Sequence, residues 1–180
     1  MMVFFINLGR NLEREKAIAR TDFVTGAVNT SYFHELLQIE MDRSSRYLHP
    51  LTIAYIDVDN FKTVNDTFGH VAGDMVLRSI AESMQDNLRS TDVVARVGGD
   101  EFALILPETE QDAAKAAITK MRIKLSEKMK RDGWPVTFSI GVVTFITAPD
   151  SVDAAFDTAD RLMYSVKAHG KDNVNYAILK

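Results

Sequence analysis

Residues 51–58 form a nearly continuous apolar run, and this run restricts the possible folds more than any other feature. Apolar side chains at successive positions leave neither side of a β-strand for water, so the run predicts a central strand that is covered on both faces. Asp57 and Asp59 lie at its end, on the same side because side chains alternate along a strand. We therefore expect carboxylates at one end of a buried strand.

The remaining apolar patterns alternate between helix and strand. Asn29 is expected to cap a helix that ends near His49–Pro50. Residues 59–70 read as a polar connection. Helical spacing recurs in residues 33–41, 71–88, 114–129 and 156–166, and β-prone runs lie at 93–97, 102–106, 136–145 and 174–179. This order predicts an α/β (α+β) domain of ferredoxin-like or polymerase-palm type, with a mixed central sheet and helices on its faces.

Length and the N-terminal residues set the expected domain boundaries. With 180 residues, the chain can form one well-packed core but not two domains of ordinary size. Residues 1–20 are expected to be a helical extension, and residues 21–180 the domain itself. The apolar run at 1–6 stops at Asn7, far short of the roughly 20 residues that span a bilayer, so no membrane span is expected in this chain. The extension is either the stub of an upstream sensor or membrane segment, or a helix that packs on itself.

Composition narrows the ligands and the compartment. The net charge of -4 provides no broad basic surface, which argues against DNA or RNA polymers and leaves mononucleotides open. The absence of cysteine excludes disulfides, thiolate metal sites and thiol nucleophiles. The cytoplasm is the expected location, with tethering to the inner membrane through a longer native chain as the alternative.

Two pairs of acids suggest a metal site. Taken alone, Asp57 and Asp59 read more simply as part of an Asp-rich turn. A second pair, Asp100 and Glu101, follows Gly98–Gly99 at a turn between two β-prone runs, where it can meet the first pair across neighbouring strands. Oxygen ligands suit Mg²⁺ or Mn²⁺, and two such ions can promote attack of a hydroxyl on phosphorus. The glycines let the backbone approach phosphates.

Residues 98–102 read Gly-Gly-Asp-Glu-Phe, and the chain resembles the GGDEF family of diguanylate cyclases. The resemblance runs from about Thr21 to the C-terminus. Other segments that resemble motifs of the family, in the same order, are residues 22–26, 56–62, 65–66, 68–70, 73–74, 139–141 and 159–167. The resemblance implies that two GTP molecules are condensed into cyclic di-GMP, with release of two pyrophosphates. It also implies a homodimer in which each subunit holds one GTP.

The resemblance further implies roles for individual residues. Two Mg²⁺ or Mn²⁺ ions would be held by Asp57, the carbonyl of Val58, Asp100 and Glu101. Glu101 would serve as a further ligand or as the base toward the 3′-hydroxyl, and Lys62 would join Asp100 and Glu101 as a catalytic residue.

Substrate recognition is implied in the same way. Asn65 and Asp74 would recognise guanine, because a carboxylate accepts from ring donors that adenine lacks. His70 would line the same pocket. The phosphates would be contacted by Phe61, Lys62, Gly98, Gly99, Lys167 and Lys171.

Arg89 and Asp92 form an Arg-x-x-Asp pattern just before the diglycine turn. It resembles the inhibitory product site of the family, so the resemblance implies feedback inhibition by cyclic di-GMP. Arginine can pair with a phosphate and stack on guanine, while aspartate accepts from the guanine edge. Arg43 and Lys120 are further candidates from other elements.

Two departures from the family pattern bear on this reading. Thr30–Ser31 stand where basic residues are usual, and Lys171–Asp172 replace the usual Arg-Asn. Two other functions stay open: a receptor that binds GTP or cyclic di-GMP without making it, and a cyclase that makes a monomeric cyclic nucleotide. The intact acids Asp57, Asp100 and Glu101 argue against the receptor.

Overall fold

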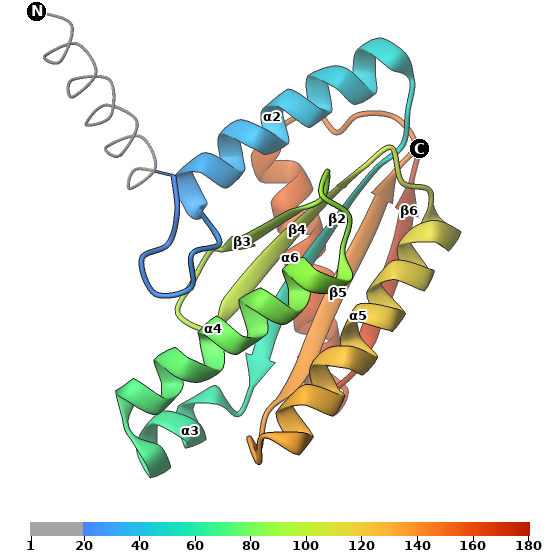
Figure 1. Cartoon of the computed structure of the whole chain (residues 1–180). Helices are drawn as coiled ribbons and strands as arrows, with labels where there is room; N and C mark the ends of the chain where they lie inside the picture. The colour runs from blue at the N-terminus through green and yellow to red at the C-terminus, as the bar shows by residue number, and fades with distance from the viewer. Residues whose placement is uncertain (1–19) are drawn as a thin grey trace, which may run out of the picture.

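The computed structural model describes residues 20–180, which form a six-stranded mixed sheet with helices on both faces (Figure 1). Across the sheet the strand order is β1-β3-β4-β2-β5-β6. The strands are β1 (Val28–Asn29), β2 (Leu51–Asp59), β3 (Val93–Arg96), β4 (Glu101–Pro107), β5 (Thr137–Phe145) and β6 (Val174–Leu179). The helices are α2 (Thr30–Tyr47), α3 (Phe61–Phe68), α4 (His70–Asn87), α5 (Gln111–Arg131) and α6 (Val152–Ala168). The predicted mixed α/β fold is confirmed, and the extension expected at residues 1–20 lies, apart from Arg20, outside the described residues.

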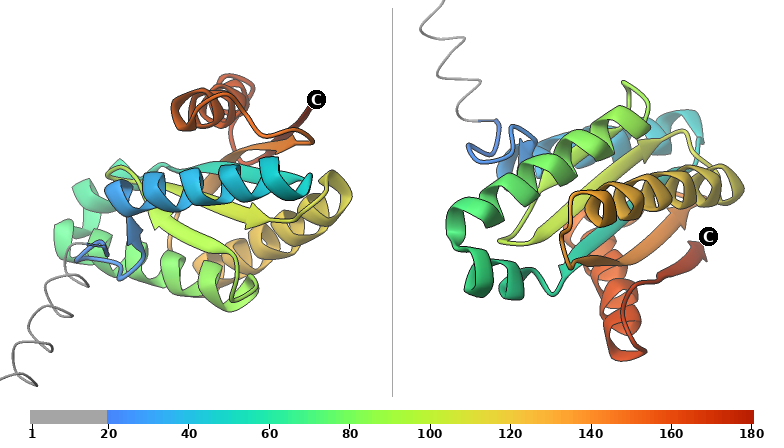
Figure 2. Two further views of the ribbon diagram at one scale, coloured as in Figure 1. Left: turned by 90° about the horizontal axis from the view of Figure 1, so that it is seen from above. Right: turned by 60° about the horizontal axis from the view of Figure 1, so that its bottom comes forward.

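The central position of β2 follows from its two apolar faces. It pairs antiparallel with β4 on one side and with β5 on the other. Ile53 and Tyr55 belong to a core shared with α2 and α6. Ala54 and Ile56 belong to a second core shared with α4 and α5. Figure 2 shows these two helix layers on opposite sides of the sheet, so the prediction of a strand covered on both faces is confirmed.

Local signals place the ends of α2 close to the predicted positions. Oδ1 of Asn29 accepts a hydrogen bond of 3.0 Å from the backbone N–H of Tyr32, as an N-cap does. The helix ends at Tyr47, and Leu48 adopts the left-handed conformation with φ of 56°. The predicted cap is confirmed, and the helix ends two residues before the expected His49.

One expectation about residues 59–70 is wrong, and the helix expected at residues 71–88 is confirmed as α4. The supposed polar connection contains α3, which buries only Phe61 and Val64 and therefore shows too little apolar repetition to be recognised. Val71 fits the helical spacing of the following segment but is 77% exposed. It lies in the first turn of α4, whose buried residues begin only at Gly73.

Gly141 allows α6 to lie directly on β5. A Cβ atom at this position would lie 2.2 Å from the carbonyl oxygen of Ala159 and 2.3 Å from the nitrogen of Met163, both in α6. Backbone cannot give way cheaply, so only glycine permits this approach. The contact brings the C-terminal turn of α6 to the end of β2.

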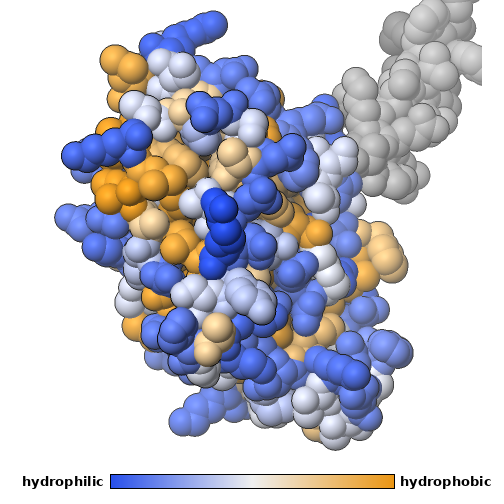
Figure 3. All heavy atoms as spheres, turned by 180° about the vertical axis from the view of Figure 1, so that it is seen from behind, coloured by the Kyte–Doolittle hydropathy of each residue, from blue (hydrophilic) through white to orange (hydrophobic). Residues whose placement is uncertain are grey.

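Hydrophilic side chains dominate the face seen from behind, and hydrophobic ones are confined to smaller groups (Figure 3). Within residues 20–180, no helix combines the length and the apolar character needed to cross a bilayer.

Candidate active site

The end of β2 and the turn between β3 and β4 bring three predicted acids together. Asp57 is paired with Glu101 in the β2–β4 register. The backbone N–H of Val58 donates to the carbonyl oxygen of Asp100 over 3.0 Å. Asp57 is buried, whereas Asp100 and Glu101 are partly exposed. Backbone pairing therefore places the three carboxylates at one edge of the molecule.

Burial and neighbouring negative charges raise the pKa values of two of these acids. Burial raises the pKa of Asp100, and the charge of Asp57 raises it further. Burial also raises the pKa of Glu101, with added contributions from Asp57, Asp100 and Asp160, while a hydrogen bond from Tyr55 opposes the change. An excess of carboxylates that repel one another fits a site that receives a cation.

Lys167 is the cation that faces Asp57. Its Nζ donates to Oδ2 of Asp57 over 2.8 Å. Burial would lower the pKa of Lys167, but the hydrogen bond and charge of Asp57 outweigh this effect and raise it. One lysine does not balance the neighbouring acids.

No group of three or more acid or histidine side chains within residues 20–180 is already arranged to hold a metal ion. The donors nevertheless fit a divalent ion in chemistry, because they are carboxylate oxygens under mutual repulsion.

The diglycine turn is held in place by Arg96, which the sequence reading did not single out. Its guanidinium donates to the carbonyl oxygens of Gly98 and Gly99 over 3.1 and 2.7 Å, and to Asp22 over 3.1 Å. A Cβ atom at Gly98 would lie 2.1 Å from Oε2 of Glu101, so the Glu101 carboxylate folds back over this glycine. An arginine two residues before the first glycine of the turn was the available signal.

Tyr55 is a second residue that the sequence reading did not assign to the site. Its hydroxyl lies near the Glu101 carboxylate and, as a hydrogen-bond donor, opposes the rise in the pKa of Glu101. Burial and then the charge of Glu101 raise the pKa of Tyr55, so the phenol remains a donor. The sequence signal for Tyr55 was an aromatic residue with a hydroxyl group, two residues before Asp57 in a mostly apolar strand.

Asp59 does not need the cation that its position seemed to require. It is 1% exposed and accepts from Oγ1 of Thr137 over 2.9 Å, Oγ of Ser139 over 2.8 Å and the backbone N–H of Asp172 over 3.1 Å. These donors compensate the buried charge. Asp57 and Asp59 therefore differ in role although they leave the same strand.

The residues expected to recognise guanine come from α3 and α4. A Cβ atom at Gly73 would lie 2.0 Å from Oδ1 of Asn65 and 3.1 Å from the ring of Phe61, so both side chains lie against this glycine. Asp74 follows directly and is partly exposed. His70 at the start of α4 and Lys62 in the first turn of α3 are exposed.

Lys171 approaches the same edge from the loop after α6. Its Nζ donates to Oδ1 of Asn60 over 3.2 Å, and Asn60 joins β2 to α3. Lys167 and Lys171 therefore both contact residues at the end of β2.

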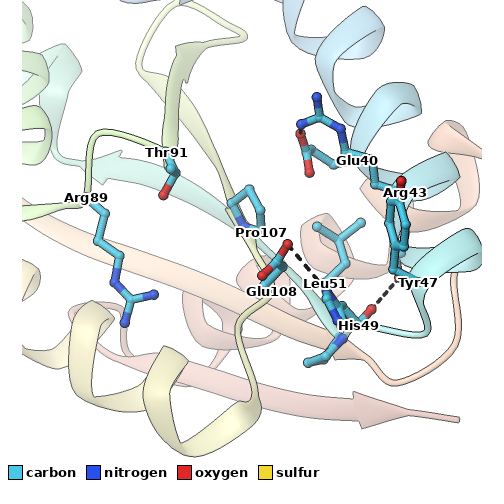
Figure 4. Close-up of a pocket in the computed structure, with 11 residues that line it drawn as sticks. Glu40, Arg43, Tyr47, His49, Leu51, Arg89, Thr91, Pro107 and Glu108 are labelled. Atoms are coloured by element: carbon cyan, nitrogen blue, oxygen red, sulfur yellow. Dashed lines mark hydrogen bonds and ion pairs between the residues drawn. The ribbon is translucent and has the colours of Figure 1, made fainter.

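Arg89 and Asp92 lie in a separate region, at the other end of β3 from the diglycine turn. Arg89, Asp92 and Lys120 line a pocket of about 540 Å³. Arg89 also lines a neighbouring pocket of about 520 Å³, where it lies across from Arg43 (Figure 4). Four candidate residues from three segments of the chain thus lie around two adjacent pockets.

Asp92 is only partly satisfied in this region. Its Oδ2 accepts from the backbone N–H of Arg89 over 2.8 Å, while its buried Oδ1 has no hydrogen-bond partner among residues 20–180. Burial raises the pKa of Asp92, against the opposing effect of Arg89. An unpaired buried acceptor at a pocket is available to a ligand donor.

Comparison with known proteins identifies the family of this chain. The family model described as "Diguanylate cyclase, GGDEF domain" matches residues 19–173. The chain is 35% identical over 170 residues to diguanylate cyclase DgcP of Pseudomonas aeruginosa, covering 93% of this chain and 25% of the relative. It is 35% identical over 172 residues to response regulator PleD of Caulobacter vibrioides, covering 93% and 38%. The chain thus spans well under half the length of these relatives.

Solved structures show the same fold. The coiled coil and GGDEF domain of DgcB from Caulobacter crescentus, in complex with c-di-GMP, matches with a TM-score of 0.89 and 26% identity, over 98% of this chain and 95% of that one. Diguanylate cyclase SiaD from Pseudomonas aeruginosa, in complex with its activator SiaC, matches with a TM-score of 0.84 and 33% identity, over 98% and 69%. On the extent of the family match and of these relatives, the chain belongs to the GGDEF domain family.

Proposed function

We propose that this chain is a diguanylate cyclase domain that condenses two GTP molecules into cyclic di-GMP and two pyrophosphates. The observation that carries the proposal is the pairing of Asp57 with Glu101, beside Asp100, in a chain whose similar relatives include named diguanylate cyclases. Raised pKa values of Asp100 and Glu101 add to it, because perturbed acids in an exposed edge are typical of reactive sites.

Asp57, the carbonyl of Val58, Asp100 and Glu101 are the residues that would hold two Mg²⁺ or Mn²⁺ ions. Such ions, which diguanylate cyclases of this family use, polarise phosphate oxygens and neutralise the charge of the leaving pyrophosphate. In the reaction, the 3′-oxygen of one GTP bonds to the α-phosphorus of the other, and the bond from that phosphorus to the bridging oxygen breaks. Glu101, positioned by Tyr55, is the proposed acceptor of the hydroxyl proton.

The substrate residues divide into two groups in this proposal. Asn65 and Asp74, together with His70, recognise guanine between α3 and α4. The phosphates are contacted by Phe61, Lys62, Gly98, Gly99, Lys167 and Lys171. Lys62 also neutralises charge during the transfer. Each domain supplies half of the reacting atoms, so we propose that catalysis requires a homodimer with the two sites facing each other.

Turnover of the purified protein tests this function. Incubation with GTP and Mg²⁺, followed by chromatography, should yield cyclic di-GMP, and the rate per molecule should fall on dilution because the dimer dissociates. GTP binding without product at high protein concentration would instead establish a receptor. A monomeric cyclic nucleotide as product would identify the other cyclase class.

We further propose that the product inhibits the enzyme by binding near Arg89 and Asp92. The unpaired Oδ1 of Asp92, with Arg89 and Lys120 in the same pocket, supports this site. Arg89→Ala should relieve inhibition by added cyclic di-GMP while the initial rate stays within about twofold, because the residue lies away from the acids. Arg131→Ala, an exposed arginine outside the pockets that contain Arg89, is the control. Unchanged inhibition in Arg89→Ala would remove Arg89 from the product site.

A further inference from the structure

The loop between α6 and β6 carries Lys171 in an unusual backbone conformation. Lys171 has φ of 64° and Asp172 has φ of 45°, so two successive residues with side chains occupy the left-handed region. This conformation is costly for residues other than glycine and persists only where neighbouring groups hold it. The contacts of this loop therefore decide where the Lys171 ammonium lies.

Asp59 holds the loop from the side of the sheet. Its Oδ2 accepts from the backbone N–H of Asp172 over 3.1 Å. The same carboxylate is fixed to β5 by Thr137 and Ser139, and it is almost completely buried. The loop backbone is thus attached to a buried carboxylate that is itself bound to β5.

Arg122 holds the loop from the side of α5. Its Nη1 donates to Oδ1 of Asp172 over 3.0 Å and to the carbonyl oxygen of Asp172 over 3.2 Å. Two acceptors of one residue are bound by one guanidinium, which fixes both the side chain and the backbone of Asp172. Partial exposure of Arg122 and Asp172 limits the strength of the ion pair, so its main effect is on geometry.

These contacts point Lys171 at the end of β2. Its Nζ lies 3.2 Å from Oδ1 of Asn60, the residue that joins β2 to α3. Lys167 reaches the same strand end through Asp57. Loss of either attachment would let the loop relax away from its left-handed conformation and carry Lys171 with it.

We propose that Asp59, Asp172 and Arg122 are positioning residues that hold Lys171 for contact with the triphosphate of GTP, an inference that rests on the proposed function. Asp172 stands where the family usually has asparagine, and Arg122 provides the cationic partner that this acid requires. The departure at residue 172 is therefore part of a built contact between α5 and the loop.

Nucleotide binding to Arg122→Gln tests the proposal. The affinity for a non-hydrolysable GTP analogue should fall about threefold to tenfold, as expected for loss of a partly exposed charged contact. Affinity for GMP, which lacks the terminal phosphates, should stay unchanged. In turnover assays the KM for GTP should rise while kcat changes little, and Arg122→Lys should restore part of the loss.

Two comparisons separate positioning from a general loss of positive charge. Lys124→Gln removes a cation from the same helix, where Lys124 pairs only with Glu127 among the ion pairs of the described residues, and should leave GTP binding unchanged. In a Lys171→Met background, Arg122→Gln should have no further effect, because the residue it positions is absent. Equal GTP affinity in Arg122→Gln and the unchanged protein would overturn the inference while leaving the proposed function intact. Failure of the unchanged protein to bind GTP would overturn both.

Discussion

The turn at residues 22–26 and the turn at residues 97–101 contact the same guanidinium, that of Arg96, yet their carboxylates differ in surroundings. Asp22 accepts from the backbone N–H and Oγ1 of Thr25 over 2.9 and 2.8 Å, in addition to Arg96. Burial would raise the pKa of Asp22, but these hydrogen bonds outweigh it and lower the pKa. In the second turn, burial and neighbouring acids raise the pKa values of Asp100 and Glu101.

The difference separates carboxylates that build the fold from those kept for a ligand. An acid whose oxygens are bound by donors within the chain stabilises a turn, whereas acids that repel one another store an unfavourable interaction that a cation can relieve. Asp59 belongs with Asp22 in the first group, although it leaves the same strand as Asp57. The number of hydrogen-bond donors that each carboxylate receives from the chain therefore separates the structural acids from the reactive ones.

Removal of a reactive acid should have the largest effect. Asp100→Asn or Glu101→Gln should lower cyclic di-GMP formation by about a hundredfold or more, because the metal ions that these acids would hold supply several kcal/mol of charge stabilisation. Unfolding by urea should remain cooperative. Asp112→Asn, an acid that is 98% exposed, serves as the control for turnover and stability. Retained turnover in both active-site variants would refute their assignment as metal ligands.

Replacement of the structural acid Asp59 should lower the free energy of unfolding more than replacement of Asp57. Asp59→Asn keeps the volume but lacks the charge that binds three donors, so the free energy of unfolding should fall by about 2 to 4 kcal/mol. Asp57→Asn is the matched variant on the same strand and should lose less, because Asp57 has the partly exposed Lys167 as its ion-pair partner. Urea titration of both variants measures the difference. Equal losses would contradict the division between the two aspartates.

The fold could be predicted in large part because its strongest patterns are local. The apolar run at 51–58, the cap at Asn29 and the helical spacing of α5 and α6 each specify an element from neighbouring residues alone. Helix α3 could not be predicted this way, since it buries two side chains and its preceding residue, Asn60, has no side-chain capping bond.

The acids of the candidate site could be found in the sequence from motif letters, whereas the distant donors that surround each acid could not. The hydrogen-bond donors of Asp59 lie 78, 80 and 113 residues further along the chain. Arg96 and Tyr55 are similarly defined by partners across the sheet and turn. No local sequence pattern distinguishes an aspartate whose oxygens are all hydrogen-bonded from a reactive one. The distinction depends on the three-dimensional structure.

The charge of Asp22 should contribute less to the free energy of unfolding than that of Asp59, and its contribution should depend on pH. Its pKa lies below the unfolded value of 3.8, so its stabilisation is complete above about pH 4 and is lost as the pH falls through the folded-state pKa. Asp22→Asn should therefore lower the free energy of unfolding by about 1 kcal/mol at pH 7 and by less at pH 3. If Asp22→Asn lowered the free energy of unfolding equally at pH 7 and pH 3, the loss would come from packing and not from the charge of Asp22.

Glu101→Gln should change stability in the opposite direction. The pKa of Glu101 is raised above its ordinary value of 4.5, so the charged form destabilises the folded state at pH 7 and protonation removes that cost as the pH falls. A glutamine can still accept from Tyr55, so the variant should unfold at slightly higher urea concentration at pH 7, and the gain should vanish below about pH 4. Partial exposure of Glu101 keeps the gain smaller than the loss at Asp22. Glu110→Gln, an exposed acid, is the control, and a loss of stability in Glu101→Gln at pH 7 would place Glu101 among the structural acids.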